Sequence, residues 1–287
     1  MTNYPYLGAG IGLRRDHYAE LKETERTLDW LEFISENYMD HGGHHRRTLR
    51  RAAERWPLIP HGVSLDIGGR DEPSADYLRD LKALADELDA PFVSDHLCLS
   101  RVGGVYTHEL IPIPYRHEVV ELVARRVRLI QEELGRPLLL ENATYYVNMP
   151  GAEMSEAEFM TRIAGESGCG LLLDVNNTYV NSVNHGFDAK AFLEELPLES
   201  VGYMHLAGHR VEERALIDDH GSAVPDPVWE LYRFVLERRG PVSTLIEWDS
   251  NLPDLDRVLE EADKARAVLA EYGAQPVEAA RSLGVSS

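Results

Sequence analysis

Eight short segments rich in apolar residues recur along this 287-residue sequence, and stretches with helical periodicity separate several of them. Such apolar runs, bounded by turn residues, are typical of strands buried in a sheet. The predicted strands cover residues 7–13, 30–38, 58–67, 91–99, 137–142, 170–175, 201–207 and 242–248. Helical periodicity is clearest between them at residues 77–88, 117–134 and 228–238.

A strand followed by a helix, repeated eight times, requires parallel strands joined by right-handed crossovers. Closing eight such units gives a (β/α)₈ barrel, and a doubly wound open sheet is the alternative. Helix-end signals agree with this order: Ser155 and Glu158 have the spacing of a capping box, and Gly135 stands where the helix over 117–134 should end. We therefore predict an α/β fold, a single TIM-barrel domain over residues 1–287, with a frayed tail after about residue 273.

Charge and cysteine content restrict the partners and the cofactor. The chain carries 49 acidic and 29 basic residues, a formal charge of −20, which disfavours nucleic acid as a partner. The N-terminus lacks the pattern of a signal peptide and no apolar run is long enough for a membrane span, so we expect a cytoplasmic protein. Only Cys98 and Cys169 are present, far apart, so a bound metal would be held by imidazole and carboxylate groups. Zinc, iron and manganese suit such ligands.

Histidine and acidic residues interrupt the predicted strands from the third onward. One such residue is more often a satisfied core or turn residue than a ligand, but their recurrence on strands three to eight is a different observation. The carboxyl ends of barrel strands meet at one mouth, so the pattern predicts a metal centre with more than one ion there. The candidates are His61, Asp66, His96, Glu141, Asp174, His205, His209 and Glu247, with Asp218 and His220 in the loop after strand seven.

The spacing of these residues suggests individual roles. Asp218 and His220 stand two apart, so in an extended segment both would face one cation. The two oxygens of Glu141 suit a bridge between neighbouring ions. Asp249, two residues after Glu247 on the same face, is the candidate for proton transfer. At the end of the second predicted strand, Glu36 and Asn37 are the candidates for substrate contact.

Seven segments together resemble one known family: IPHGVSLDIGG, VSDHLCLS, LLLENATYY, LLLDVNNTYVNSVNHGFD, YMHLAGH, IDDHGSAVPDPVW and LIEWDSNLP. They are similar to the multinuclear non-heme iron-dependent oxidative enzymes, which include the methanobactin-biosynthesis B subunit. The resemblance extends from GAGIGLR near the N-terminus to LIEWDSNLP, almost the whole chain. The segment LLLDVNNTYVN with NHGFD after it is its most specific part.

The resemblance implies a xylose-isomerase-like TIM barrel that holds two or three iron ions, in mixed Fe(II) and Fe(III) states. It implies an enzyme that uses O₂ to oxidise residues, very often cysteine, of ribosomally made precursor peptides, together with a small partner protein that recognises the peptide leader. Carried over by position, it assigns His61, His96 and Glu141 to one iron; Glu141, Asp174, His205 and Glu247 to a second; and Asn177, Asp218 and His220 to a third.

Two other functions fit a metal-binding barrel of this kind. One is a metal-dependent phosphodiesterase or sugar isomerase. A trinuclear zinc endonuclease is an example of such a phosphodiesterase, and its His, Glu and Asp ligands follow a similar order along the chain. We would expect histidine at position 177 in such an endonuclease, and this chain has an asparagine. The other is a protein that binds metal on a retained barrel without catalysis.

Overall fold

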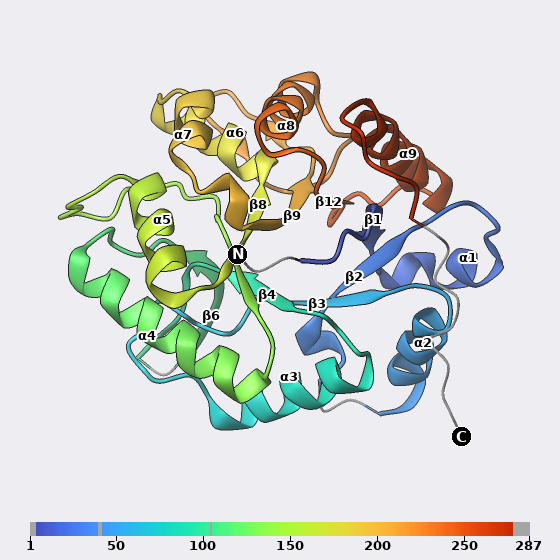
Figure 1. Ribbon diagram of the computed structural model, residues 1–287, viewed down its shortest axis with the longest axis horizontal. Coiled ribbons are helices and arrows are strands. Elements are labelled where there is room, and N and C mark those ends of the chain that lie inside the picture. The colour runs from blue at the N-terminus through green and yellow to red at the C-terminus, as the bar shows by residue number, and fades with distance from the viewer. Residues whose placement is uncertain (1–3, 40–41, 104, 278–287) are drawn as a thin grey trace.

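The predicted barrel is confirmed (Figure 1). The computed structural model describes residues 4–39, 42–103 and 105–277. All neighbouring barrel strands are parallel, and β1 closes the ring by pairing with both β2 and β12. In chain order the barrel strands are β1 (Ala9–Gly12), β2 (Trp30–Ile34), β3 (Leu58–Gly62), β4 (Val93–His96), β7 (Leu138–Glu141), β8 (Gly170–Asp174), β9 (Val201–Leu206) and β12 (Ser243–Ile246).

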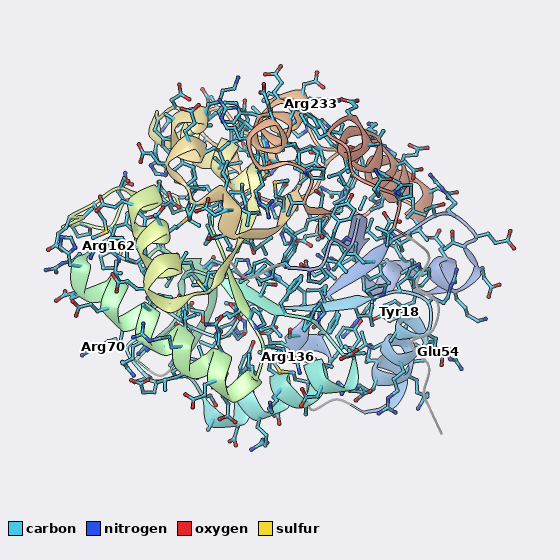
Figure 2. All side chains as sticks on the ribbon, in the orientation of Figure 1. Tyr18, Glu54, Arg70, Arg136, Arg162 and Arg233 are labelled. Atoms are coloured by element: carbon cyan, nitrogen blue, oxygen red, sulfur yellow. The ribbon has the colours of Figure 1, made fainter. Side chains whose placement is uncertain are left out.

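Helices surround the strands on the outside (Figure 1), and charged side chains such as Arg162 and Arg233 lie on the outer circumference (Figure 2). The α-helices are α1 (Tyr18–Glu23), α2 (Gly43–Ala53), α3 (Ala75–Glu87), α4 (His117–Leu134), α5 (Glu156–Ser167), α6 (Val175–His185), α7 (Ala189–Glu195), α8 (Asp226–Arg239) and α9 (Leu255–Glu271). Short 3₁₀ helices are η1 (Arg15–His17), η2 (Ser35–Asn37) and η3 (Leu198–Ser200). None of the helices in the described ranges combines the length and apolar character that a membrane span requires.

Sequence signals at helix ends have clear structural counterparts. The hydroxyl of Ser155 accepts a hydrogen bond from the backbone N–H of Glu158 at 3.1 Å and caps α5. Gly135 ends α4 in the left-handed conformation, with φ of 65°, which glycine adopts without strain.

Several predicted strands are shorter than their apolar runs. β2 ends at Ile34 and β3 at Gly62, because the apolar residues that follow pack in loops; Leu65 and Ile67, for example, are buried beyond the end of β3. Two hairpins were not predicted: β5 (Leu99–Val102) with β6 (Val105–Ile111), and β10 (Arg210–Val211) with β11 (Leu216–Ile217). Of the predicted frayed tail, residues 278–287 lie outside the described residues.

The inside of the barrel holds its own apolar layer. Side chains of a strand alternate between the barrel interior and the surrounding helices. The interior layer consists of Leu7, Trp30, Ile59, Phe92, Leu139, Leu172, Tyr203 and Leu245. Tyr4 packs against this layer where β8 begins, and Gly170 leaves room for it, since a Cβ there would lie 2.4 Å from the Tyr4 hydroxyl oxygen. The amino-terminal end of the barrel is therefore filled, and the next layer lies toward the mouth.

Leu172→Ala tests whether this layer stabilises the barrel. Leu172 is fully buried, so its truncation should lower the free energy of unfolding by about 2–5 kcal/mol. Leu129→Ala on α4, where the side chain is 49% exposed, is the matched control and should cost less than about 1 kcal/mol. Urea denaturation of both variants measures the difference, and equal losses would contradict the packing described.

Candidate metal centre

A polar layer lies directly above the apolar one. Each of its residues follows an interior apolar residue by two positions, so both side chains point into the barrel. Trp30 is followed in this way by Glu32, Ile59 by His61, and Leu139 by Glu141. The same step leads to Ser94, Asp174, His205 and Glu247. All seven residues of this layer are buried, although four of them carry carboxyl groups.

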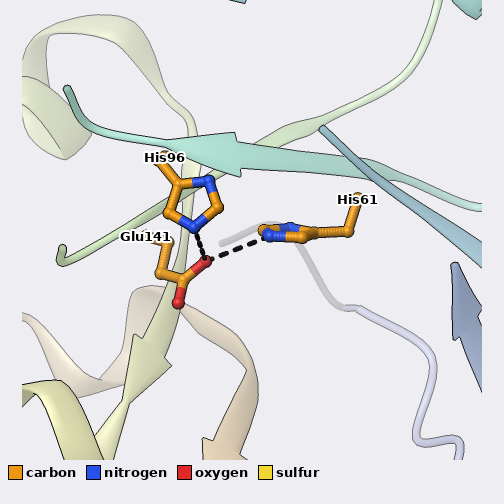
Figure 3. Close-up of side chains that lie close together, drawn as sticks. All are labelled: His61, His96 and Glu141. Carbon is orange, nitrogen blue, oxygen red and sulfur yellow. Dashed lines mark ion pairs between the residues drawn. The ribbon is translucent and has the colours of Figure 1, made fainter. Parts of the chain in front are cut away.

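The first group of side chains joins β3, β4 and β7. Glu141 directs one carboxylate oxygen, Oε2, at two imidazole rings (Figure 3). This oxygen lies 3.4 Å from Nε2 of His61 and 3.3 Å from Nε2 of His96. Two ligand atoms at about 2.1 Å from one ion, in tetrahedral arrangement, lie about 3.4 Å apart. The three residues could therefore hold one metal ion.

The second group shares Glu141 with the first. Nδ1 of His205 lies 2.9 Å from Glu247 Oε2, 3.5 Å from Glu141 Oε1 and 3.8 Å from Asp174 Oδ2. Ligand atoms of these four residues lie within 4.8 Å of one another, so the group could hold a second ion. Because the two oxygens of Glu141 face different groups, this carboxylate has the geometry of a bridge.

His220 forms the centre of a third group beside the second. Its Nδ1 lies 3.3 Å from Glu247 Oε2 and 3.2 Å from Asp249 Oδ2, and these three residues form a compact set. Its Nε2 lies 2.7 Å from Asp218 Oδ1. The extended segment expected around Asp218 and His220 is not present: His220 is in the left-handed region with φ of 44°, and this turn brings the two side chains together.

Asn177, the remaining predicted ligand, borders the same cavity. Its Oδ1 accepts a hydrogen bond from Thr144 at 2.9 Å, and its Nδ2 donates to the backbone oxygen of Asn142 at 3.0 Å. Asp174 caps α6 by accepting from the Asn177 N–H at 2.6 Å. The cap therefore fixes Asn177 next to the second group.

Several buried atoms of these groups make no hydrogen bond of acceptable geometry within the described residues, although carboxylate oxygens lie close to some of them. They are Glu141 Oε2, Asp174 Oδ2, His205 Nδ1 and His220 Nε2. Buried polar atoms are nearly always satisfied, and an unsatisfied one points to an ion or water at that place. All four belong to the three groups, so the residues fit bound metal ions.

Hydrogen bonds orient the imidazole rings for metal binding. Nδ1 of His96 lies 3.1 Å from the backbone oxygen of Gly62, which can only accept, so Nδ1 carries the proton and Nε2 presents a lone pair to Glu141. Nε2 of His205 lies 3.0 Å from Glu32 Oε2, so Nδ1 presents its lone pair to the second group. Fixing the tautomer in this way is the usual role of a carboxylate behind a metal-bound histidine.

A chain of hydrogen bonds also connects His61 to the carboxylate of Glu32. The Tyr203 hydroxyl donates to Glu32 Oε2 at 2.6 Å and lies 2.6 Å from Ser94 Oγ. Ser94 Oγ in turn lies 2.9 Å from His61 Nδ1. Because the Glu32 carboxylate only accepts, the protons along this chain all point toward it, and His61 Nε2 is left free for an ion.

The electrostatics of the layer require positive charge. Burial alone would lower the pKa of His205, but the carboxylates of Glu32, Glu247 and Glu141 outweigh it and raise the pKa well above the usual value. Burial also raises the pKa of Asp174 well above its usual range, and Glu141 adds to the effect. Without an added cation, protons must therefore compensate the buried carboxylates; a metal ion would do so without them.

The pKa of His61 is shifted in the opposite direction from that of His205. Burial lowers its pKa well below the usual value, and the neighbouring His96 and His205 lower it further. The ring is therefore neutral at physiological pH, which is the form that binds metals.

The groups open into a cavity of about 500 Å³ at the mouth of the barrel. Its walls include Ile34, Val63 and Leu110, together with Tyr106 and His108 from the β5–β6 hairpin. Glu36 is outside this lining: its Oε1 accepts from the Tyr77 hydroxyl at 2.7 Å and from the Val63 N–H at 2.9 Å. Asn37 is exposed in η2 and does not border the cavity, so contact of either residue with substrate stays a prediction.

Comparison with known proteins identifies the family. The model of the RiPP precursor modification enzymes MbnB/TglH/ChrH, which act on ribosomally made precursor peptides, matches residues 8–270. The chain belongs to this family. A UPF0276 protein of Anaeromyxobacter sp. (strain Fw109-5) is 47% identical over 262 residues, which cover 91% of this chain and 93% of the relative. A UPF0276 protein of Caulobacter vibrioides is 45% identical over 268 residues, covering 93% and 96%.

Solved structures with the same fold are distant in sequence. A D-psicose 3-epimerase of Clostridium cellulolyticum H10 matches with a TM-score of 0.54 and 13% identity, covering 91% of this chain and 94% of that one. A xylose isomerase domain protein of Planctomyces limnophilus matches with a TM-score of 0.55 and 13% identity, covering 93% and 98%. These matches confirm a xylose-isomerase-like TIM barrel and nothing further about function.

Sequence reasoning missed Glu32, Ser94, Tyr203 and Arg14. The first three lie inside apolar runs, where a single polar residue is easily taken for an ordinary core residue. Their positions could have identified them. Glu32 and Ser94 follow an interior apolar residue by two positions, and Tyr203 precedes the ligand-type residue His205 by two positions. Arg14, whose Nη2 lies 3.6 Å from Glu247 Oε1, follows β1, a strand on which no ligand candidate was found.

Glu32→Gln tests the orienting role of this carboxylate. An amide can donate as well as accept, so it no longer fixes the protons of His205 and Tyr203, and metal affinity should fall roughly 10–100-fold. Anaerobic titration with Fe(II) or Co(II) measures the affinity. Glu261→Gln, which alters a buried glutamate on α9 away from the cavity, is the control and should bind metal as the native chain does. Equal affinities for both variants would contradict the role of Glu32.

Proposed function

We propose that this enzyme is a multinuclear iron-dependent, O₂-using oxidase that modifies residues, most often cysteine, of a ribosomally made precursor peptide. The observation that carries the proposal is the pair of ligand groups joined through Glu141 in a member of a peptide-modifying family. Two adjacent redox-active ions would suit oxidative chemistry.

The donor set supports iron. The described groups offer imidazole and carboxylate atoms, and both cysteines, Cys98 and Cys169, are buried outside them. Ligands of this type suit iron as well as zinc and manganese, and the asparagine at position 177 offers a weaker third site for zinc than histidine would. Iron bound there would supply O₂ activation and electron transfer, while the chain supplies binding, orientation and proton handling.

The cavity suits one side chain of an extended peptide. Val63 and Leu110 offer apolar surface to the peptide, and His61, His96, Glu141 and Glu247 are accessible from the same space. Burial of these ligands limits water at the reacting atoms, which would protect oxidised intermediates of the peptide from hydrolysis.

Asp249 is the proposed proton acceptor. Its side chain is 43% exposed, whereas that of the neighbouring Glu247 is 7% exposed. Oδ2 of Asp249 can therefore take the proton that the peptide group loses on binding and pass it to solvent. Its distance of 3.2 Å to His220 Nδ1 keeps it next to the ligand groups.

Further proposals concern the setting of the reaction. We propose a small partner protein that recognises the peptide leader, since the described cavity accommodates only a short part of a peptide. We also propose a cytoplasmic location, where ribosomally made precursors are available. The charge of −20 makes nucleic acid an unfavourable substrate.

Glu141→Ala tests the proposed function most simply. The native chain, purified without oxygen and loaded with Fe(II), should retain more than one iron ion per chain and consume O₂ when the precursor peptide is added. Glu141→Ala should retain at most one ion and lose this activity, because the variant lacks the carboxylate common to both groups. Glu213→Ala, an exposed change after β10, is the control.

Metal analysis and oxygen electrode measurements give the outcome. Full iron content in Glu141→Ala would contradict the ligand assignment. Stoichiometric zinc without iron in the native chain, together with cleavage of an abasic-site duplex, would contradict the oxidase and support the endonuclease alternative.

A further inference from the structure

Arg14 places a partly buried positive charge at the edge of the candidate metal centre. Its side chain is 14% exposed and follows β1, on the wall of the barrel next to β12. The guanidinium contacts Asp249 Oδ1 through two of its nitrogens, with Nε at 3.1 Å, and Nη2 lies 3.6 Å from Glu247 Oε1. A cation beside metal ligands repels metal ions, so its presence requires a specific reason.

The barrel provides a recess for this guanidinium. A Cβ atom on Gly12 would lie 2.8 Å from Arg14 Nη1 and 2.9 Å from its Cζ. The glycine in β1 therefore leaves the space that the guanidinium occupies. Burial opposes the charge, but the carboxylates of Asp249 and Glu247 outweigh it and raise the pKa of Arg14, so the side chain stays protonated.

The two carboxylate oxygens of Asp249 contact different partners. Oδ1 faces Arg14, while Oδ2 lies 3.2 Å from His220 Nδ1. Without the arginine, Asp249 would be a free carboxylate in a set with His220 and Glu247, whose ligand atoms lie within 4.8 Å of one another. Such a carboxylate would be free to bind an ion together with His220 and Glu247.

We infer that Arg14 is a positioning residue, which holds the carboxylate of Asp249 through Oδ1 and prevents it from becoming a metal ligand. The inference rests on the proposed function and extends it: at this edge of the centre, the cation that follows β1 determines which carboxylates can bind an ion. Gly12 is required for this arrangement, because any side chain there would displace the guanidinium of Arg14.

Cobalt(II) titration under anaerobic conditions tests the inference, since the visible absorption of cobalt reports its coordination. Arg14→Gln should tighten the weakest cobalt site roughly tenfold, by removing a repelling charge and releasing a carboxylate, and should change its absorption spectrum. Conversion of the precursor peptide should fall at the same time. Adding Asp249→Asn to Arg14→Gln should return the cobalt affinity toward the native value. Arg14→Lys keeps the charge without the two-nitrogen contact and should be intermediate.

Gly12→Ala provides a test that leaves Arg14 in the chain. It should reproduce the tighter cobalt binding and altered spectrum of Arg14→Gln, because the methyl group fills the recess. Cobalt binding that is unchanged in both variants, or that Asp249→Asn does not reverse, would overturn the inference alone. A native chain that binds no cobalt and no iron would overturn the proposed function and the inference with it.

Discussion

The concentration of buried carboxylates at the mouth of the barrel is the constraint on which the rest of the structure depends. Glu32, Glu141, Asp174 and Glu247 are buried around the imidazole of His205. Four carboxyl groups in such a place cannot all ionise unless cations compensate them. The unsatisfied oxygens of Glu141 and Asp174 point to the positions where cations would be.

The barrel achieves this arrangement with a simple repeat. On seven of the eight barrel strands, all except β1, one residue packs in the apolar layer and the residue two positions later reaches the polar layer. Rigid strands therefore place the candidate ligands, and the layer beneath, with Tyr203 and Trp30 in edge-to-face contact, supports the hydrogen bonds that orient them. Loops contribute Asp218, His220 and Asp249 of the third group.

The sequence allowed the barrel and most of the candidate centre to be predicted, because ligand-type residues break apolar runs at their carboxyl ends. His61, His96, Glu141, Asp174, His205 and Glu247 are brought together as strand geometry requires. Loop conformation could not be derived in this way: the turn at His220 depends on a left-handed backbone, and Glu36 is tied to Tyr77 rather than directed at the cavity. Arg14 could not be found either, since the recess that holds it is formed by the absence of a side chain at Gly12.

Anomalous diffraction at the iron absorption edge, from crystals of the anaerobically loaded protein, tests the central claim directly. We predict two iron peaks joined by the Glu141 carboxylate, each about 2.0–2.2 Å from its ligand atoms. One should face His61 and His96, and the other should face Asp174, His205 and Glu247. Iron-loaded crystals without an anomalous peak within bonding distance of Glu141 would contradict the account.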